Sequence, residues 1–218
     1  MVVALLGHGT VGGGVYELLK NRSDITVKYV LDRSPIAELG AVSVTDFSTI
    51  LNDGEVDTVV EVMGGLEPAH GYMVAAMRAG KNIVTANKHL LAAYYDELTT
   101  LAKETGIGFR TSAAVGGGIP WLPNLQRLKR IGAVNEVCGI MNGTTNYILS
   151  TMHKKGYDYE SVLRDAQSFG YAEADTTADI EGYDIQRKLM ISANIAFDAR
   201  LTEQQVPAAG IAGITRED

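Results

Sequence analysis

Cysteine, positive charge and long apolar runs are scarce in this sequence, and each scarcity excludes a class of protein. The 218 residues include one cysteine, Cys138, so no internal disulfide framework forms and a reducing, cytoplasmic compartment is expected. Lys and Arg number 19 against 26 Asp and Glu, and the net charge of −7 argues against nucleic-acid and anionic-membrane partners. No apolar run reaches the ~18 residues of a membrane span. The first apolar run, Val2–Leu6, is not preceded by the basic region of a signal peptide.

The composition is that of a folded globular protein. Apolar residues make up 46% and charged residues 21%, which excludes overall disorder. A chain of this length buries enough of its own surface to need no metal for stability. Its 24 glycines follow no collagen-like period, so we expect them in turns and ligand-binding loops.

The first 110 residues alternate between strand and helix patterns. Val2–Leu6 reads as a buried strand, and the apolar stripe of Val11, Val15 and Leu18 that follows predicts a helix. Further strands are predicted at Thr26–Leu31, Val56–Met63, Asn82–Ala86 and Ile107–Ser112. A short helix is predicted to begin after a cap at Thr45 or Asp46 and to end at Leu51. Two longer helices are predicted, one from Pro68 to Gly80 and one from Tyr94 to Glu104. This order is typical of an α/β fold with a Rossmann-type doubly wound parallel sheet.

The pattern changes after the glycine-rich Gly116–Pro120, and we place a domain boundary near residue 130. Residues 1–130 then form the doubly wound domain, and residues 131–218 form a second, α+β part. In that part Asn135–Met141 is predicted to be a strand of a different sheet. Helices are predicted at Thr145–Lys155, Glu160–Phe169 and Asp179–Phe197, with Gly156 and Gly170 as helix-ending glycines.

The loop after the first strand has the spacing of a dinucleotide-binding turn. Gly7, Gly9 and Gly12 form a GxGxxG that opens a helix: the first permits the turn, the second lets a pyrophosphate approach, and the third packs helix on strand. A purely structural glycine turn is the alternative. Asp32 ends the next strand and would take the ribose hydroxyls of NAD, whereas the adjacent Arg33 would meet the 2′-phosphate of NADP. The alternative is that Asp32 and Arg33 are two polar side chains that only face solvent.

Two further strand ends carry candidate residues. Gly64 and Gly65 follow the third strand, and Lys88 follows the fourth. Ligands of such sheets lie outside the carboxyl ends of the strands, so Gly64 and Gly65 are predicted to border the nicotinamide side of the cofactor site. Lys88, on the same edge, would supply a positive charge to cofactor or substrate. An ordinary tight turn and a solvated lysine are the alternatives.

The second half concentrates charge of both signs. Asp184 and Lys188 are four residues apart and share a helix face. With Glu173 and Glu181 they suit a substrate that carries an ammonium and a carboxylate. From the spacing of Asp184 and Lys188 alone, an ordinary surface ion pair is the favoured explanation. Cys138 lies in an apolar stretch and is expected to be a small core residue, which counts against a covalent aldehyde dehydrogenase.

Six segments together resemble the homoserine dehydrogenase family. They are Gly7–Gly14, Thr85–Lys88, Ala114–Pro120, Asn142–Leu149, Gly170–Asp175 and Asp179–Lys188. The resemblance covers nearly the whole chain in order. Family members continue for roughly another hundred residues, so the sequence is expected to correspond to their N-terminal two thirds, with residues 131–218 as an incomplete dimerisation and substrate-binding domain.

The resemblance implies reversible, NAD(P)-dependent hydride transfer between L-homoserine and L-aspartate 4-semialdehyde, a step of threonine and methionine biosynthesis. It also implies that Glu173 and Asp184 bind the substrate, that Lys188 moves the proton, and that Lys88 lies near nicotinamide and substrate. The implied cofactor contacts are Gly7, Gly9, Thr10, Val11, Gly12, Asp32, Arg33, Gly64, Gly65, Lys88 and Gly170.

A cation and a second copy of the chain complete the expectation. The resemblance implies that backbone carbonyls of Ser112, Val115, Gly117 and Ile119 hold a sodium or potassium ion, although a hinge explains these glycines as well. It also implies a homodimer formed near Asn135–Met141. The alternatives are a related semialdehyde or hydroxy-acid dehydrogenase, and a fragment that binds nucleotide without catalysis.

Overall fold

The computed structural model describes residues 1–170 and 175–215. The chain divides into two compact units, residues 1–124 and residues 125–218. This division falls inside helix α6 (Trp121–Leu128), a few residues before the boundary near residue 130 that the sequence predicts. In the described part of the chain, none of the helices combines the length and the apolar character that crossing a bilayer requires.

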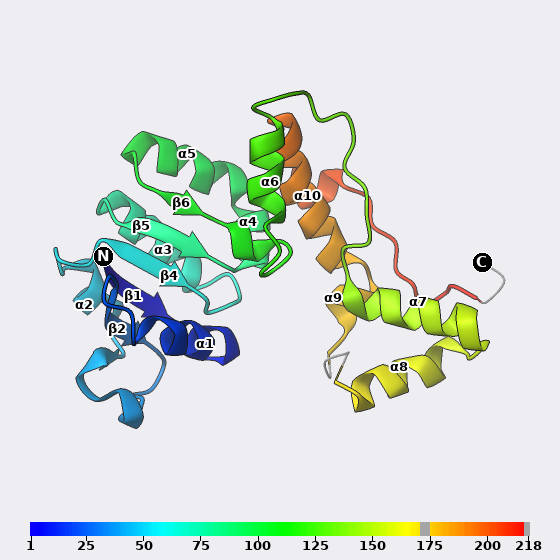
Figure 1. The fold of residues 1–218 in the computed structure, drawn as a ribbon, viewed down its shortest axis with the longest axis horizontal. Coiled ribbons are helices and arrows are strands. Elements are labelled where there is room, and N and C mark those ends of the chain that lie inside the picture. Colours follow the sequence, from blue (N-terminus) through cyan, green and yellow to red (C-terminus); the bar gives the residue numbers. More distant parts are fainter. Residues whose placement is uncertain (171–174, 216–218) are drawn as a thin grey trace. The chain divides into compact units, whose positions relative to one another are not determined.

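The first unit is built on a six-stranded sheet (Figure 1) whose paired strands are all parallel. The strands are β1 (Val2–Leu6), β2 (Thr26–Leu31), β3 (Ser43–Val44), β4 (Thr58–Glu61), β5 (Asn82–Thr85) and β6 (Phe109–Arg110). Their order is β3-β2-β1-β4-β5-β6, two mononucleotide-binding halves that meet between β1 and β4. The predicted Rossmann-type fold is therefore confirmed.

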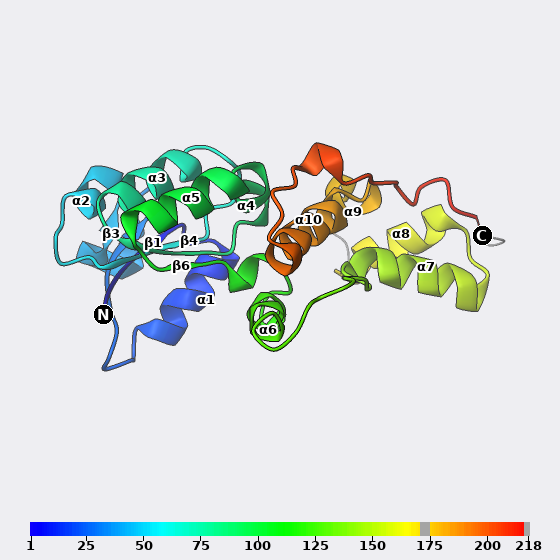
Figure 2. The same ribbon diagram turned by 90° about the horizontal axis from the view of Figure 1, so that it is seen from above.

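Helices cover both faces of this sheet (Figure 2). They are α1 (Thr10–Leu19), α2 (Phe47–Leu51), α3 (Ala69–Arg78), α4 (Lys88–Ala93) and α5 (Tyr95–Thr105), with short 3-10 helices at Ala37–Val42 and Ser112–Ala114. Val3 and Leu5 of β1 pack in one core cluster with residues of α1, whereas Ala4 and Leu6 pack in the other with residues of α2, α3 and α5. The period of two along β1 thus fixes which helix covers which face.

The residues at the ends of these helices and strands test several local predictions. Asp46, and not Thr45, caps α2, because its carboxylate accepts the backbone N–H of Ser48 at 2.8 Å. Gly106 ends α5 with a φ of 71°, as expected for a left-handed cap. The sequence analysis missed α4, a helix of six residues. It also made β4 and β6 too long, since the outer residues of both predicted segments are not paired in register with a neighbouring strand.

The buried face of α1 differs from the predicted apolar stripe. Val11 and Leu18 are exposed at 55% and 77%, while Gly12 is buried and Val15 and Tyr16 pack on the sheet. A Cβ atom on Gly12 would overlap the carbonyl oxygen of Gly7. The close approach at Gly12 therefore sets the rotation of the helix and turns Val11 and Leu18 outward.

The second unit consists, over its described residues, of helices joined by irregular segments. It contains α7 (Gly143–Lys155), α8 (Tyr159–Ser168), α9 (Thr177–Ile180), α10 (Tyr183–Phe197) and a 3-10 turn at Glu203–Gln205. Helices α7 and α8 lie side by side in both ribbon views (Figures 1 and 2) and share a core built around Ile148, Met152 and Val162. Gly156 and Gly170 adopt φ values of 69° and 74°, so both predicted helix-ending glycines are confirmed.

The strand predicted for Asn135–Met141 is wrong, since this segment is irregular and pairs with no strand in the described part of the chain. A strand needs a neighbour for its backbone N–H and C=O groups, and apolar character alone does not supply one. The prediction of a buried Cys138 fails for the same reason, because the thiol lies on this uncovered segment and is exposed.

The predicted helix Asp179–Phe197 is two helices with a break at Gly182. This glycine has a φ of 81°, and a Cβ atom on it would lie 2.9 Å from the carbonyl oxygen of Ala209. The chain returns beside the break, where the N–H of Ile211 donates to Ile180 at 2.9 Å. Glycine is thus required both by the backbone conformation and by the returning segment.

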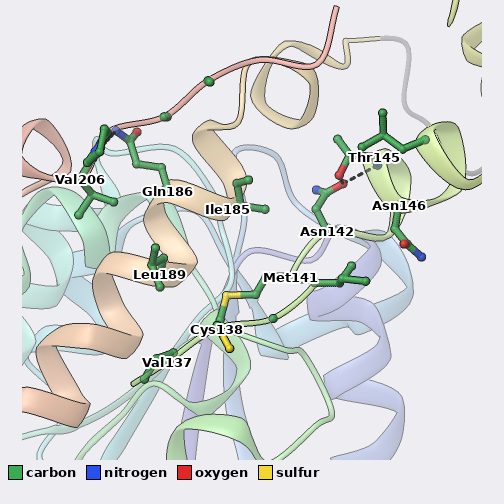
Figure 3. Close-up of a pocket in the computed structure, with 16 residues that line it drawn as sticks. Val137, Cys138, Met141, Asn142, Thr145, Asn146, Ile185, Gln186, Leu189 and Val206 are labelled. Atoms are coloured by element: carbon green, nitrogen blue, oxygen red, sulfur yellow. Dashed lines mark hydrogen bonds between the residues drawn. The ribbon is translucent and has the colours of Figure 1, made fainter. Parts of the chain in front are cut away.

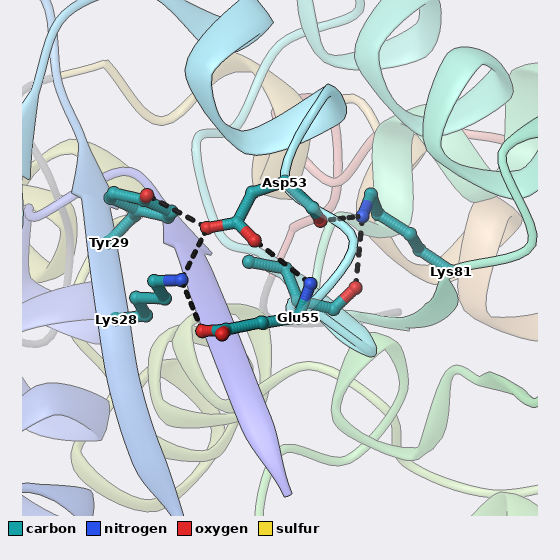
Figure 4. Close-up of polar contacts among 6 residues, drawn as sticks. Lys28, Tyr29, Asp53, Glu55 and Lys81 are labelled. Carbon is teal, nitrogen blue, oxygen red and sulfur yellow. Dashed lines mark hydrogen bonds and ion pairs between the residues drawn. The ribbon is translucent and has the colours of Figure 1, made fainter.

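A polar cluster fixes the connection between α2 and β4 (Figure 4). One carboxylate oxygen of Asp53 accepts hydrogen bonds from the Lys28 ammonium at 2.6 Å and the Tyr29 hydroxyl at 2.8 Å. The Lys81 ammonium is buried and donates to the backbone carbonyl of Asp53 at 2.7 Å and to that of Val56 at 2.9 Å. The hydrogen bond from Lys28, followed by the N–H of Glu55 and the Tyr29 hydroxyl, lowers the pKa of Asp53 to about 2.

This cluster predicts an acid-dependent contribution to stability. A carboxylate whose pKa is lowered by folding stabilises the fold above its unfolded pKa of about 3.9, and this stabilisation is lost as the pH falls toward 2. We expect Asp53→Asn to lower the urea midpoint at pH 7, and the difference from the parent to shrink between pH 4 and pH 2. Glu104→Gln, an exposed acid of the same unit, is the control. A difference that does not change with pH would contradict the assignment.

Candidate functional site

A cavity of about 380 Å³ opens in the first unit at the carboxyl ends of β1, β2 and β4. Its walls come from the loops that follow these strands and from the start of α3. The lining residues are Gly7, His8, Gly9, Leu31, Asp32, Arg33, Thr45, Val62, Met63, Gly64, Glu67, Pro68 and Tyr72. The cavity therefore lies where the strand order reverses, which is the place where open α/β sheets bind their ligands.

The three glycines of the β1–α1 loop have three different surroundings. Gly7 has a φ of 97°, and a Cβ atom on it would lie 3.1 Å from the Cα of Met63. Gly12 packs on Gly7, as described above. A Cβ atom on Gly9 would meet nothing within 4 Å, so the protein leaves the space beside Gly9 open.

Helix α1 begins beside the open space at Gly9. Gly9 is the N-cap of α1, and no side chain in the described part of the chain caps this helix. The first N–H groups of a helix without a cap favour an anion, and the helix dipole adds to this preference. The geometry thus fits a pyrophosphate at the start of α1.

Asp32 and Arg33 lie beside this loop, and both line the cavity. The Asp32 carboxylate accepts the N–H of His8 at 3.0 Å and that of Arg33 at 2.7 Å. It therefore ties β2 to the glycine loop, a structural role that the sequence analysis did not predict. A carboxylate has about four lone-pair positions, so Asp32 retains acceptor capacity for hydroxyl groups in the cavity.

The predicted cofactor residues do not all lie at the cavity. Gly7, Gly9, Asp32, Arg33 and Gly64 come together around the cavity, and Thr10, Val11, Gly12 and Gly65 are their chain neighbours without lining it. Lys88 is the first residue of α4. Gly170 belongs to the second unit, just beyond α8. Glu173 lies outside the residues that the structure describes.

A buried acid, Glu61, organises the carboxyl ends of β4 and β5. Glu61 is 0% exposed. Its carboxylate accepts the Met63 N–H at 2.9 Å, the Thr85 hydroxyl at 2.6 Å and the Asn87 side-chain amide at 3.3 Å. Asn87 also donates to the Gly65 carbonyl at 2.8 Å and caps α4 through the N–H of Leu90 at 3.1 Å. The sequence analysis missed this role. The signal that could have revealed it is an acidic residue within a buried strand.

The charged candidates of the second unit form a partly buried network. The Lys188 ammonium lies 2.7 Å from the Asp184 carboxylate and donates to the Met141 carbonyl at 2.6 Å. The side chains of Asp184 and Lys188 are only 9% and 19% exposed. The alternative of an ordinary surface ion pair is therefore wrong, because both charges are largely removed from water.

Asn142 joins this network and was not predicted to do so. Its side-chain amide donates to Asp184 at 2.9 Å and to Asp179 at 2.7 Å. Its oxygen accepts the Thr145 N–H at 2.8 Å and so caps α7. An asparagine directly before the Gly-Thr-Thr start of a helix is a recognisable N-cap signal, but the spacing does not reveal the contact with Asp184.

A second, mostly apolar cavity of about 530 Å³ lies in the same unit (Figure 3). Figure 3 shows Ile185 and Leu189 of α10 on one side and the segment from Val137 to Met141 on the other. Neither Asp184 nor Lys188 lines it. It adjoins the charged network through Met141 and Asn142, which line the cavity and contact Lys188 and Asp184 respectively.

The predicted cation loop has a backbone that turns sharply. Gly116 and Gly117 have φ values of 90° and 57°. Among the four carbonyls proposed as ligands, that of Ile119 accepts the N–H of Trp121 at 2.7 Å. The ligand set of Ser112, Val115, Gly117 and Ile119 remains a prediction.

Two family models match the chain in succession. Residues 7–111 match the NAD-binding domain of homoserine dehydrogenase, and residues 120–218 match the homoserine dehydrogenase model. The Bacillus subtilis homoserine dehydrogenase is 41% identical over 230 residues, which cover 99% of this chain and 53% of that enzyme. The chain thus spans about half the length of the curated relatives it matches, which is less than the two thirds expected from the sequence.

Solved structures agree with this assignment. A homoserine dehydrogenase from Thiobacillus denitrificans superposes with a TM-score of 0.93 at 39% identity, over 100% of this chain and 54% of that one. A structure from Archaeoglobus fulgidus, provisionally named a homoserine dehydrogenase, gives 0.87 at 32% identity over 100% and 74%. Since both halves of the chain match in order, and the glycine loop stands at the switch point of the sheet, the chain belongs to the homoserine dehydrogenase family.

Proposed function

We propose that this chain binds NAD(P) in the cavity of its first unit and takes part in the reversible reduction of L-aspartate 4-semialdehyde to L-homoserine. The observation that carries the proposal is the convergence of Gly7, Gly9, Asp32, Arg33 and Gly64 on one cavity. When bound, the cofactor supplies or accepts the hydride. The reaction belongs to threonine and methionine biosynthesis, for which we expect a cytoplasmic setting.

The second unit supplies the groups that handle the substrate. Two of the three N–H donors of the Lys188 ammonium are used by the Asp184 carboxylate and the Met141 carbonyl. The third N–H is therefore available to the substrate oxygen. In this proposal Lys188 gives a proton to that oxygen during reduction and takes it back during oxidation. Asp184 and Glu173 bind the charged groups of the amino acid, and Lys88 adds positive charge near the nicotinamide.

Gly9 gives the sharpest test of nucleotide binding. Gly9→Val fills the open space where the pyrophosphate must approach, without a clash inside the protein. We expect the fold to survive and the NADH affinity to fall at least tenfold, by about 1.4 kcal/mol. Gly14→Val, which also places its Cβ in open space on α1, is the matched control. Equal affinities for the parent and Gly9→Val in a fluorescence titration would refute the site.

The same titration decides the cofactor preference. We propose that Asp32 favours NADH, because its carboxylate accepts ribose hydroxyls and repels a 2′-phosphate. A preference for NADPH that disappears in Arg33→Ala would reverse this proposal.

Lys188 is tested by a substitution that keeps its charge. Lys188→Arg preserves the ion pair with Asp184, but a guanidinium does not give up its proton at neutral pH. We expect kcat for the oxidation of L-homoserine to fall by ~10²–10⁴-fold, with nucleotide affinity unchanged. Lys129→Arg is the control, since Lys129 also binds a carbonyl and a carboxylate in this unit. A change of less than about twofold would contradict the role. A parent chain that binds NADH and never oxidises homoserine would favour a nucleotide-binding fragment.

The cation and the dimer complete the proposal. We propose that the carbonyls of Ser112, Val115, Gly117 and Ile119 hold a sodium or potassium ion, supported by the positive φ values at Gly116 and Gly117. Equal thermal stability in potassium chloride and in tetramethylammonium chloride would refute it. We also propose a homodimer that covers the apolar segment near Ile140, which is 80% exposed. A mass of one 23.3 kDa chain by light scattering would refute that.

A further inference from the structure

Glu61 connects two loops that meet at the edge of the nucleotide cavity. The first follows β4: the N–H of Met63 is held by Glu61, and Met63 and Gly64 line the cavity. The glycine turn packs directly against this loop, since a Cβ on Gly7 would lie 3.1 Å from Met63. The position of the β4 loop is therefore set by Glu61 on one side and bounded by Gly7 on the other.

The second loop follows β5 and leads to Lys88. The Thr85 hydroxyl donates to Glu61 and accepts the N–H of Asn87 at 3.0 Å. Asn87 in turn caps α4 and donates to the carbonyl of Gly65. The backbone of Lys88, the first residue of α4, thus follows an anchored cap, and the two loops are joined through Asn87.

The three hydrogen bonds to the Glu61 carboxylate described above all come from donors. One oxygen accepts the Met63 N–H and the Asn87 amide, and the other accepts the Thr85 hydroxyl. In Glu61→Gln the side-chain NH₂ group faces a donor that the carboxylate accepts from in the parent, so that donor loses its acceptor. Since the site has no exposed surface, water does not replace the lost hydrogen bond, and the loops must move instead.

We infer that Glu61 is a positioning residue, which sets the two loops so that they hold the nicotinamide half of the cofactor. This inference rests on the proposed binding of a dinucleotide. Asp32 lies on the β2 side of the switch point and Glu61 on the β4–β5 side, so the two acids serve the adenosine half and the nicotinamide half respectively.

The experiment compares two ligands that differ only in the nicotinamide. Calorimetry gives the affinities of NADH and of ADP-ribose for the parent and for Glu61→Gln. We expect the NADH affinity to fall roughly tenfold, as for the loss of about one good polar contact, and the ADP-ribose affinity to change less than about twofold. Asp57→Asn is the matched control, because Asp57 accepts the N–H of Val2 just before the other end of β4 and is expected to leave both affinities unchanged.

A second pair of variants tests the same inference if Glu61→Gln does not fold. Thr85→Val removes the hydroxyl that bridges Glu61 and Asn87, and Thr58→Val removes one that donates to Asp57 at 2.6 Å. We expect only Thr85→Val to weaken NADH relative to ADP-ribose.

Three outcomes would overturn the inference. Equal losses for both ligands in Glu61→Gln and Thr85→Val would indicate a purely structural role. A parent that binds ADP-ribose as tightly as NADH would leave no nicotinamide contact to position. A parent that binds neither ligand would refute the dinucleotide proposal itself, and this inference with it.

Discussion

The parallel pairing of β1 with β2 on one side and with β4 on the other is the constraint on which the first unit depends. Because parallel strands end at the same edge of the sheet, the loops after all three strands meet there. The buried, apolar β1 carries the glycine turn, β2 carries Asp32, and β4 carries Glu61. The ladder therefore determines which residues meet at this edge of the sheet, and the glycines only let the backbones come close enough.

A capping asparagine beside a buried acid occurs in both units. Asn87 caps α4 and donates to Glu61, and Asn142 caps α7 and donates to Asp184. In each case the oxygen of the amide accepts an N–H at the helix start, and the nitrogen donates to a buried carboxylate. A buried polar group of this kind is costly when a partner is removed, so the geometry around it is held firmly.

Much of the first unit could be predicted from the sequence, because its strands are buried runs and its helices carry capping signals. Asp46, Gly106 and Gly156 end or begin helices as the patterns predict. The glycine loop and Asp32 were found for the same reason, since each stands at a strand end. The pattern could not reveal that Gly12, through its contact with Gly7, sets the rotation of α1 and so exposes Leu18.

The failures have a common physical cause, namely contacts between residues distant in sequence. Asn135–Met141 has the composition of a strand, yet a strand exists only when another strand accepts its hydrogen bonds. Glu61 and Asn142 were missed because their partners lie 24 to 42 residues away. The break at Gly182 depends on Ala209, which local periodicity does not report.

The most direct test of the account is a crystal structure of this chain grown with NAD⁺. The account predicts the pyrophosphate within hydrogen-bond distance of the first N–H groups of α1, beside Gly9, with the adenosine ribose on Asp32 and the nicotinamide toward Gly64 and Gly65. Nucleotide bound elsewhere on the chain, or a cavity that stays empty at millimolar NAD⁺, would contradict it.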